Sequence, residues 1–316
     1  ATLAVLATAA WWSRRDRGPL AAILLFGGTL IPVLGFVNVY PFVFSYVADH
    51  FQYLASLGMI AFLAAVATRG FALLAWPRWS GAAVAAGVLL LLGGLTWRQS
   101  GMYRDVFSLY ETTLARNPSS WVAQLNLGTA LDDAGRPAES LPHLQRALEL
   151  KPNFPETLNS LGSVLNQLGR SPEALPLLEQ AVQIQPRFAG AHNTLAVALM
   201  AVGRSDNGIT EFRRAVELDP ALVQARVNLG WALANQGHAA EAIAEYEQAR
   251  RLQPDFASAE FKWGLTLAMN NRVLDAVPHF TRAVDLQPED PDMRYVLGGA
   301  LFEVGRRTDA IAQFEE

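Results

Sequence analysis

The hydrophobic pattern of the chain changes abruptly near residue 100. Before this point apolar residues form long uninterrupted stretches, and the clearest of them, 79–97 (WSGAAVAAGVLLLLGGLTW), contains no charged residue. After it, apolar residues recur three or four positions apart among polar ones, which is the period of helices with one buried face. The pattern predicts an all-α chain of two domains: a polytopic membrane domain over 1–98, followed by an α-solenoid of helix pairs over 99–316.

Three stretches of the first domain are long enough to cross a bilayer as helices, because a span needs roughly 20 apolar residues. They are 19–37, 51–68 and 79–97. Residues 1–12 are apolar but too short to cross alone, and we interpret them as the end of a helix that begins upstream. This gives about four transmembrane helices, the first one truncated. The alternative is a set of buried helices in a large soluble protein, which would rarely contain so few charges.

Arginine placement predicts the orientation of these helices. The loops 13–18 and 69–80 contain three and two arginines, and the loop 38–50 contains no basic residue other than His50. By the positive-inside rule the first two loops are cytoplasmic. Arg98 and Arg104 oppose this assignment but are outnumbered. We therefore expect an integral, multi-pass protein of the inner or plasma membrane whose solenoid is extracytoplasmic.

The second domain has a strict 34-residue period. Prolines stand at positions 118, 152, 186, 220, 254 and 288. A column of small residues has the same spacing: Gly128, Gly162, Ala196, Gly230, Gly264 and Gly298. So does a column of large ones: Leu144, Leu178, Phe212, Tyr246, Phe280 and Phe314. We expect the small column to mark a close approach of two helices, and the large column to fill the gap between successive repeats.

Each period predicts two helices and two turns. Gly135, Gly169, Gly203 and Gly237 can leave the helical region at low cost after the first helix. Ser171 followed by Pro172 predicts an N-cap and a first-turn proline for the second helix. The periodic proline ends that helix. One pair cannot bury its apolar face, whereas stacked pairs can, as in a solenoid.

These motifs resemble the tetratricopeptide repeat (TPR), and the segment NLGTALDDAGRPAESLPHLQRALELKP (126–152) carries the resemblance most clearly. Residues 99–316 would comprise one leading helix, five full repeats and a truncated sixth. In such proteins the first helix of each pair lines a concave face that binds peptides. The resemblance places eight residues in that groove: Asn126, Asn159, Asn193, Asn228, Trp231, Phe261, Lys262 and Tyr295.

The asparagines of this groove could pair with a peptide backbone, and the aromatic residues could supply contact area. Asn126 and Asn228 resemble the asparagine ladder of O-GlcNAc-transferase repeats. Ser160, Thr194, Lys262 and Val296 replace asparagine in the other repeats, so we expect this ladder to be broken. The alternative is that all eight are ordinary polar or exposed positions.

The sequence contains few other chemical signals. It has no glycine-rich phosphate loop, no HExxH and no G-x-S-x-G motif, so we expect no cofactor. His143 and His279 share one repeat position four periods apart, which predicts a solvated helix face and no metal site. The chain has no cysteine, and beyond residue 100 acidic residues outnumber basic ones. This charge argues against nucleic acid as a partner.

The combination of a membrane domain with extracytoplasmic repeats resembles the transmembrane-and-TPR O-mannosyltransferase family of the GT-C class, and its bacterial relatives. The family's motif DR-x-x-YLPS-x-G is matched at Asp49, Tyr53, Leu54, Ser56 and Gly58, and is changed at His50 and Ala55. Residues 95–118 resemble the family's junction into the repeats. The resemblance implies a lipid-phosphate sugar donor, such as a polyprenyl-phosphate sugar, and a protein acceptor. The family's acidic catalytic motif lies upstream of this sequence, so the catalytic residues are unknown.

Two functions remain open. The first is a glycosyltransferase-like protein whose repeats bind protein acceptors or partners, with donor-site candidates Asp49, His50, Gln52 and Tyr53. The second is a non-enzymatic, membrane-anchored scaffold for an envelope complex. In the second case Asp49 would simply cap a membrane helix at its N-terminus, where a carboxylate is favoured.

Overall fold

The computed structural model describes residues 105–315, together with Ala83, Gly87, Leu90, Gly94 and Trp97. The chain divides into two compact units, 1–104 and 105–316. The predicted spans 19–37 and 51–68, the boundary at residue 98 and the candidates Asp49, His50, Gln52 and Tyr53 lie outside the described residues. They remain predictions.

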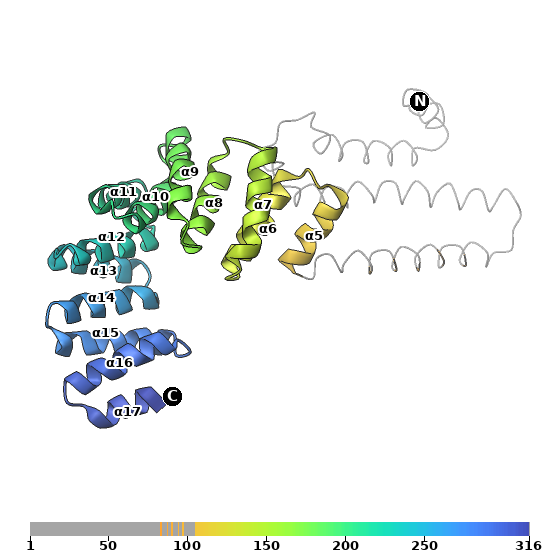
Figure 1. Cartoon of the computed structure of the whole chain (residues 1–316). Helices are drawn as coiled ribbons and strands as arrows, with labels where there is room; N and C mark the ends of the chain where they lie inside the picture. The colour runs from red at the N-terminus through yellow and green to blue at the C-terminus, as the bar shows by residue number, and fades with distance from the viewer. Residues whose placement is uncertain are drawn as a thin grey trace, which may run out of the picture. The chain divides into compact units, whose positions relative to one another are not determined.

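Residues 106–315 form a series of α-helices that stack in chain order (Figure 1), as the 34-residue period predicted. A leading helix, α5, is followed by six hairpins, and each hairpin contacts the next. The helices are α5 (Val106–Arg116), α6 (Trp121–Asp133), α7 (Pro137–Leu150), α8 (Pro155–Gln167), α9 (Ser171–Ile184), α10 (Ala189–Ala201), α11 (Ser205–Leu218), α12 (Val223–Asn235), α13 (Ala239–Leu252), α14 (Ala257–Met269), α15 (Val273–Leu286), α16 (Pro291–Glu303) and α17 (Arg307–Glu315).

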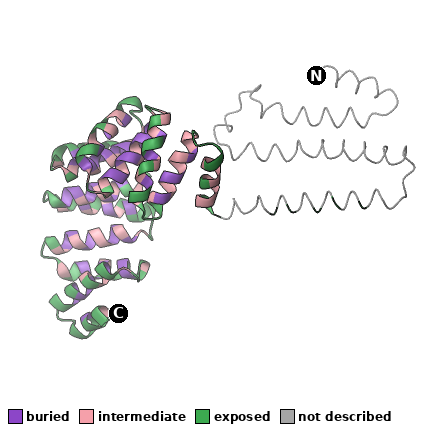
Figure 2. Ribbon diagram, turned by 45° about the vertical axis from the view of Figure 1, so that its right-hand side comes forward, coloured by how far each residue is buried: buried purple, intermediate pink, exposed green. Residues whose placement is uncertain are grey.

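The two helices of each hairpin have different neighbours. The first helices, α6, α8, α10, α12 and α14, contact one another in sequence, whereas the second helices of successive hairpins do not contact each other to a comparable extent. The first helices, with α16, are therefore the inner helices of the solenoid, and α7, α9, α11, α13, α15 and α17 are the outer helices. Buried residues lie on both inner and outer helices (Figure 2), and one cluster of them extends from α10 to α17.

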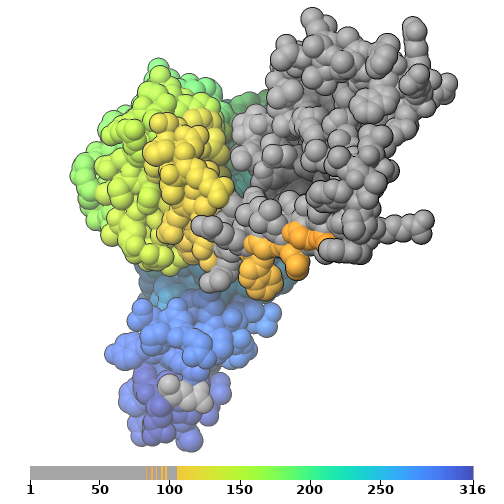
Figure 3. Space-filling model, turned by 90° about the vertical axis from the view of Figure 1, so that its right-hand side faces the viewer, coloured from red at the N-terminus to blue at the C-terminus, as the bar shows by residue number. Residues whose placement is uncertain are grey.

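The five described residues of the predicted span 79–97 are helical and exposed (orange in Figure 3). Their spacing of three and four places them on one face of a helix. Leu90 on this face is 78% exposed. None of the helices formed by the described residues combines the length and the hydropathy needed to cross a bilayer.

Residues in the left-handed region end the inner helices, as predicted. Gly169 has φ +72°, and Gly135, Gly203, Gly237 and Gly305 are similar. In the fifth hairpin Asn271 adopts φ 59° instead, because asparagine tolerates this region better than most side chains.

The predicted N-cap at Ser171 is wrong. Helix α9 begins at Ser171, and Arg170 occupies the cap position without a side-chain cap bond. The Arg170 N–H donates to the Leu165 carbonyl at 2.8 Å, which closes the turn around Gly169 and places Arg170 directly before the first residue of α9. The Ser171 side chain is consequently buried.

The small and large columns meet within each hairpin. A Cβ atom added at Gly230 would lie 2.7 Å from the ring of Tyr246 and 3.1 Å from the Ala242 carbonyl oxygen. The same glycine-to-large pairing recurs at Gly128–Leu144, Gly162–Leu178, Gly264–Phe280 and Gly298–Phe314. The large side chains therefore pack against the inner helix of their own hairpin, as well as filling the space between repeats. Phe314 is half exposed because no described helix follows α17.

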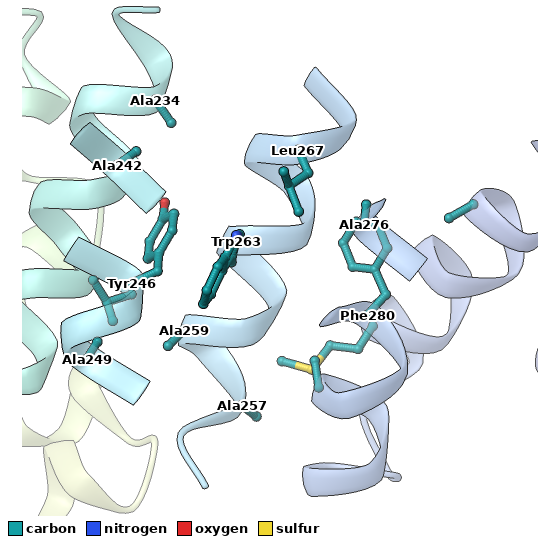
Figure 4. Packing of buried hydrophobic residues seen from close by; sticks show 14 of the residues in the cluster. Ala234, Ala242, Tyr246, Ala249, Ala257, Ala259, Trp263, Leu267, Ala276 and Phe280 are labelled. Atoms are coloured by element: carbon teal, nitrogen blue, oxygen red, sulfur yellow. The ribbon is translucent and has the colours of Figure 1, made fainter. Parts of the chain in front are cut away.

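The core between the fourth and fifth hairpins is built from three aromatic side chains on three helices (Figure 4). The rings of Tyr246 and Trp263 are stacked with centroids 6.4 Å apart, and Phe280 packs on the far side of α14. The Thr266 hydroxyl donates to the Tyr246 hydroxyl oxygen at 3.3 Å. Burial raises the pKa of Tyr246 to about 12, so this side chain is neutral at physiological pH.

We expect Gly230→Ala to destabilise the solenoid by about 1–3 kcal/mol, because Tyr246 is fully buried and cannot turn away from the added methyl group. Gly299→Ala is the matched control, since a Cβ atom at this helical position meets nothing within 4 Å. It should stabilise by about 0.5–1 kcal/mol through helix propensity. Urea unfolding followed by circular dichroism would measure both, and equal midpoints for the two variants would contradict the packing described here.

Candidate functional site

All eight residues of the predicted groove lie on inner helices. Asn126 is on α6, Asn159 on α8, Asn193 on α10, Asn228 and Trp231 on α12, Phe261 and Lys262 on α14, and Tyr295 on α16. Apart from Tyr295, which is 72% exposed, they are half-buried. A surface shared by six successive helices is long enough to follow an extended segment of another protein.

Three of these residues form a continuous polar row, which we call the Asn–Lys row. The Asn228 side-chain amide on α12 donates to the Asn193 side-chain oxygen on α10 at 3.1 Å. The Lys262 ammonium on α14 donates to the Asn228 oxygen at 3.4 Å. The asparagine ladder was predicted to be broken at Thr194 and Lys262. Hydrogen bonds nevertheless connect α10 to α14, because Asn193 bonds to Asn228 in place of Thr194 and the Lys262 ammonium group bonds in place of an asparagine amide.

Gln224 is a further member that the sequence did not reveal. Its side-chain amide donates to the same Asn228 oxygen at 3.0 Å, from one turn earlier on α12. Asn228 thus accepts two hydrogen bonds on its oxygen, which fixes the orientation of its amide group.

Lys262 is the electrostatically unusual residue of the row. Burial lowers the pKa of its ammonium group, and no carboxylate among the described residues lies within ion-pair distance of it. A desolvated cation without an opposite charge is unfavourable, whereas charged side chains on protein surfaces are usually paired or fully hydrated. An incoming carboxylate would remove this penalty.

The aromatic residues of the groove divide into two groups. Phe261 is directed towards Phe280, with ring centroids 5.8 Å apart, so it belongs partly to the core. Trp231 follows Asn228 by three positions on α12 and therefore lies beside the Asn–Lys row on the same helix face. It is half-buried and offers an apolar surface next to the polar row.

In the described part of the chain, several buried polar atoms without partners lie on α6 and α8, and another lies on α17. One side-chain oxygen of each of Asp132, Asn159 and Asn166 is buried and has no hydrogen-bond partner within the described residues. Burial raises the pKa of Asp132, against the opposing effect of a hydrogen bond from Gln167. Only Asn159 was identified from the sequence. Asp132 and Asn166 share one repeat position, but apolar residues occupy that position in the later repeats, so the column is not polar throughout.

The prediction that His143 and His279 lie on a solvated helix face is wrong. His143 Nδ1 is 2.8 Å from the Gln124 side-chain oxygen, and His279 Nδ1 is 2.7 Å from Glu260 Oε2. Each ring lies between the inner and the outer helix of its hairpin and is only partly accessible. The two histidines are in different hairpins, and among the described residues no group of three His, Asp or Glu side chains could hold a metal ion.

The comparisons with known proteins agree with this architecture. The tetratricopeptide repeat family model matches residues 108–155, 125–189, 193–257 and 261–316. A solved thermophilic TPR protein from Thermus thermophilus is 24% identical, with 58% of this chain and 100% of that chain covered and a TM-score of 0.54. This likeness shows the fold alone.

Two further solved structures are similar at lower TM-scores. YrrB, described as a TPR protein with an unusual peptide-binding site, is 23% identical, with 57% of this chain and 93% of that chain covered and a TM-score of 0.42. MamA is 24% identical, with 52% and 95% covered and a TM-score of 0.43. The search among curated proteins gave no match.

We expect Lys262→Met to leave the solenoid as stable as the wild type at pH 7, or more stable, because it removes a desolvated charge that no carboxylate compensates. The folded-state pKa of Lys262 is lowered, so the wild type loses this penalty as the pH rises through that pKa. The difference between the two proteins should therefore shrink towards about pH 10. Urea midpoints measured across this range test it, and a Lys262→Met protein clearly weaker at pH 7 would show that the ammonium group is structural.

Proposed function

The chain belongs to the tetratricopeptide repeat family, and on this premise we propose that its inner surface binds an extended protein segment whose carboxylate contacts Lys262. Tetratricopeptide repeats are protein-interaction modules. The observation that carries the proposal is the half-buried Lys262 ammonium, which has a side-chain amide oxygen beside it but no carboxylate among the described residues.

The Asn–Lys row can recognise a bound segment in two ways. Lys262 supplies the charge, and a charge-assisted hydrogen bond is shorter and roughly twice as strong as a neutral one. The asparagine amides supply the donors and acceptors that an extended backbone needs. Trp231, beside the row, would cover the apolar part of the segment. The partner we propose is therefore a protein segment with an acidic side chain or a free C-terminus and a neighbouring apolar residue.

A labelled hexaglutamate peptide is a suitable first probe, compared with hexaglutamine of the same length. Fluorescence anisotropy should show binding of the acidic peptide only. Lys262→Met should weaken it by roughly 10- to 100-fold, as expected for loss of a charged hydrogen bond of about 1.5–3 kcal/mol. Asn228→Ala should weaken it less, because the ammonium group remains.

Arg282→Met is the control for this experiment. It removes the same charge from an exposed position on the outer helix α15, so it should leave the affinity nearly unchanged. Equal losses in Lys262→Met and Arg282→Met would reduce the binding to general electrostatic attraction. Binding of hexaglutamine as tight as that of hexaglutamate would disprove the role of the carboxylate.

We further propose that the repeats are attached to a membrane domain and are extracytoplasmic. The support is the low charge of 19–37, 51–68 and 79–97, and the arginines of the loops 13–18 and 69–80. The exposed apolar face at Ala83, Gly87 and Leu90 is compatible with a lipid or helix neighbour.

A glycosyltransferase of the GT-C type is the second candidate function. It is favoured by the match at Asp49, Tyr53, Leu54, Ser56 and Gly58, and by the junction-like segment 95–118. In that case a polyprenyl-phosphate sugar would be the donor, and the repeats would present the protein acceptor. The alternative is a scaffold without enzymatic activity. Both use the same inner surface, so the peptide experiment does not separate them.

Protease added to intact spheroplasts should degrade the repeats while leaving a membrane-protected fragment of the first hundred residues. This result is expected because the loops 13–18 and 69–80 favour a cytoplasmic location. Immunoblotting with an antibody against the solenoid would measure it, with permeabilised cells as the control. Protection of the repeats in intact cells would overturn the extracytoplasmic assignment and, with it, the extracytoplasmic acceptor of the glycosyltransferase proposal.

A further inference from the structure

A cationic side chain near the start of an inner helix bridges two neighbouring parts of the solenoid. Arg226 on α12 donates from Nε to the Pro220 carbonyl oxygen at 3.0 Å and from Nη1 to Glu245 Oε2 at 2.8 Å. Pro220 lies between α11 and α12, and Glu245 lies on the outer helix α13. One guanidinium group therefore connects the turn that precedes a hairpin with the outer helix of the same hairpin.

His192 makes the same bridge one period earlier. Its Nδ1 is 2.6 Å from Glu211 Oε2 on α11, and its Nε2 is 3.1 Å from the carbonyl oxygen of Pro186, which precedes α10. The three groups correspond to those around Arg226 by a shift of 34 residues. His192 is only 8% exposed, so water cannot readily replace either contact.

The two contacts of His192 require a charged ring. A carbonyl oxygen is an acceptor, and so is an ionised carboxylate. Neutral imidazole carries one N–H and one lone pair, so one of its nitrogens would face an acceptor oxygen without a proton between them. Only the imidazolium donates from both nitrogens at once.

We propose that His192 is a pH-dependent clamp of the junction between α9 and α10: when protonated it holds the Pro186 carbonyl and Glu211 together, and when neutral it releases one of them. Arg226 performs the same task in the next hairpin with a charge that does not titrate. The solenoid then has one junction whose stiffness depends on pH, next to one whose stiffness does not.

The charges around His192 fit this role. The hydrogen bond that His192 donates to Glu211 raises the pKa of His192 most, the bond to the Pro186 carbonyl raises it further, and burial and Arg214 oppose them. Glu211 and Arg214 both belong to α11. The helices α8, α9 and α12, which also pack on α10, contribute no charged group to this environment.

The direction of the pH effect follows from the raised pKa. Stabilisation by the imidazolium is complete below the unfolded-state pKa of about 6.5, and it is lost as the pH rises through the higher folded-state value. The junction is therefore firm in mildly acidic solution and looser in alkaline solution.

The Asn–Lys row begins at the next residue. Asn193 follows His192 on α10 and accepts the hydrogen bond of Asn228. If the row binds the acidic segment, loosening of α10 should reduce the affinity as the pH rises. This consequence rests on the proposed function, whereas the clamp itself does not.

The clamp is tested by measuring melting temperature from about pH 6 to about pH 9 in the wild type, His192→Arg and His192→Gln. The wild type should lose stability across this range beyond any loss in His192→Arg, which carries the permanent charge of Arg226. His192→Gln should be less stable than the wild type at low pH and should lack the His192-dependent slope. His238→Gln is the control, since that exposed histidine should leave the slope nearly unchanged.

A direct titration avoids any dependence on the folding of variants. The imidazole resonances of the wild type, assigned to His192 by their loss in His192→Gln or by selective labelling, should give a pKa above 6.5. A value of 6.5 or below, or a full pH-dependent loss of stability in His192→Arg, would overturn the clamp. Hexaglutamate affinity measured across the same pH range tests the proposed function separately. Absence of binding at every pH would disprove the proposed function without affecting the clamp.

Discussion

The close approach of the two helices in each hairpin determines the rest of this solenoid. At Gly230 there is no room for a Cβ atom between the inner helix and Tyr246, and the same contact is repeated by the other glycines of the small column. Because the large side chain fills the space opposite the glycine, the hairpin has one geometry. Repetition of that geometry every 34 residues sets where each inner helix meets the next, and hence where the inner surface can hold polar side chains. Stability in such an array is approximately a sum of local terms, so the properties of one junction can change without altering the others.

The sequence predicted the helices well because they depend on contacts within a single period. Gly135, Gly169, Gly203 and Gly237 after the inner helices, and the small and large columns, were visible as columns spaced by 34 residues, whereas Asn271 was not. Ser171 was assigned wrongly because the turn around Gly169 places Arg170 in the cap position, so that Ser171 is already the first residue of α9.

Contacts between helices were harder to predict. The row from Asn193 to Lys262 connects residues 35 and 34 positions apart, so a search at a fixed position finds only part of it. The histidine pairs were also missed, although a signal exists: Gln124–His143, His192–Glu211, Arg226–Glu245 and Glu260–His279 are all 19 residues apart. This separation joins the first turns of an inner helix to the middle of its outer helix. The two members of each pair occupy different repeat positions, so a comparison of equivalent positions does not bring them together. Their complementary chemistry and their constant separation identify them as partners.

Two of the four pairs show how a buried or half-buried charge is compensated in this chain. Arg226 is placed between a carboxylate and a carbonyl oxygen, and Glu260 is held by His279 with Arg250 nearby at 3.8 Å. Removing one partner from such a group leaves a charge without compensation, so these positions can change only together. Lys262 differs from all of them, since it is desolvated and its ammonium group contacts only an amide oxygen among the described residues. Unlike Arg226 and Glu260, Lys262 has no opposite charge beside it among the described residues, and its desolvation costs stability. The simplest physical reason is that the compensating charge arrives with a partner on the inner surface.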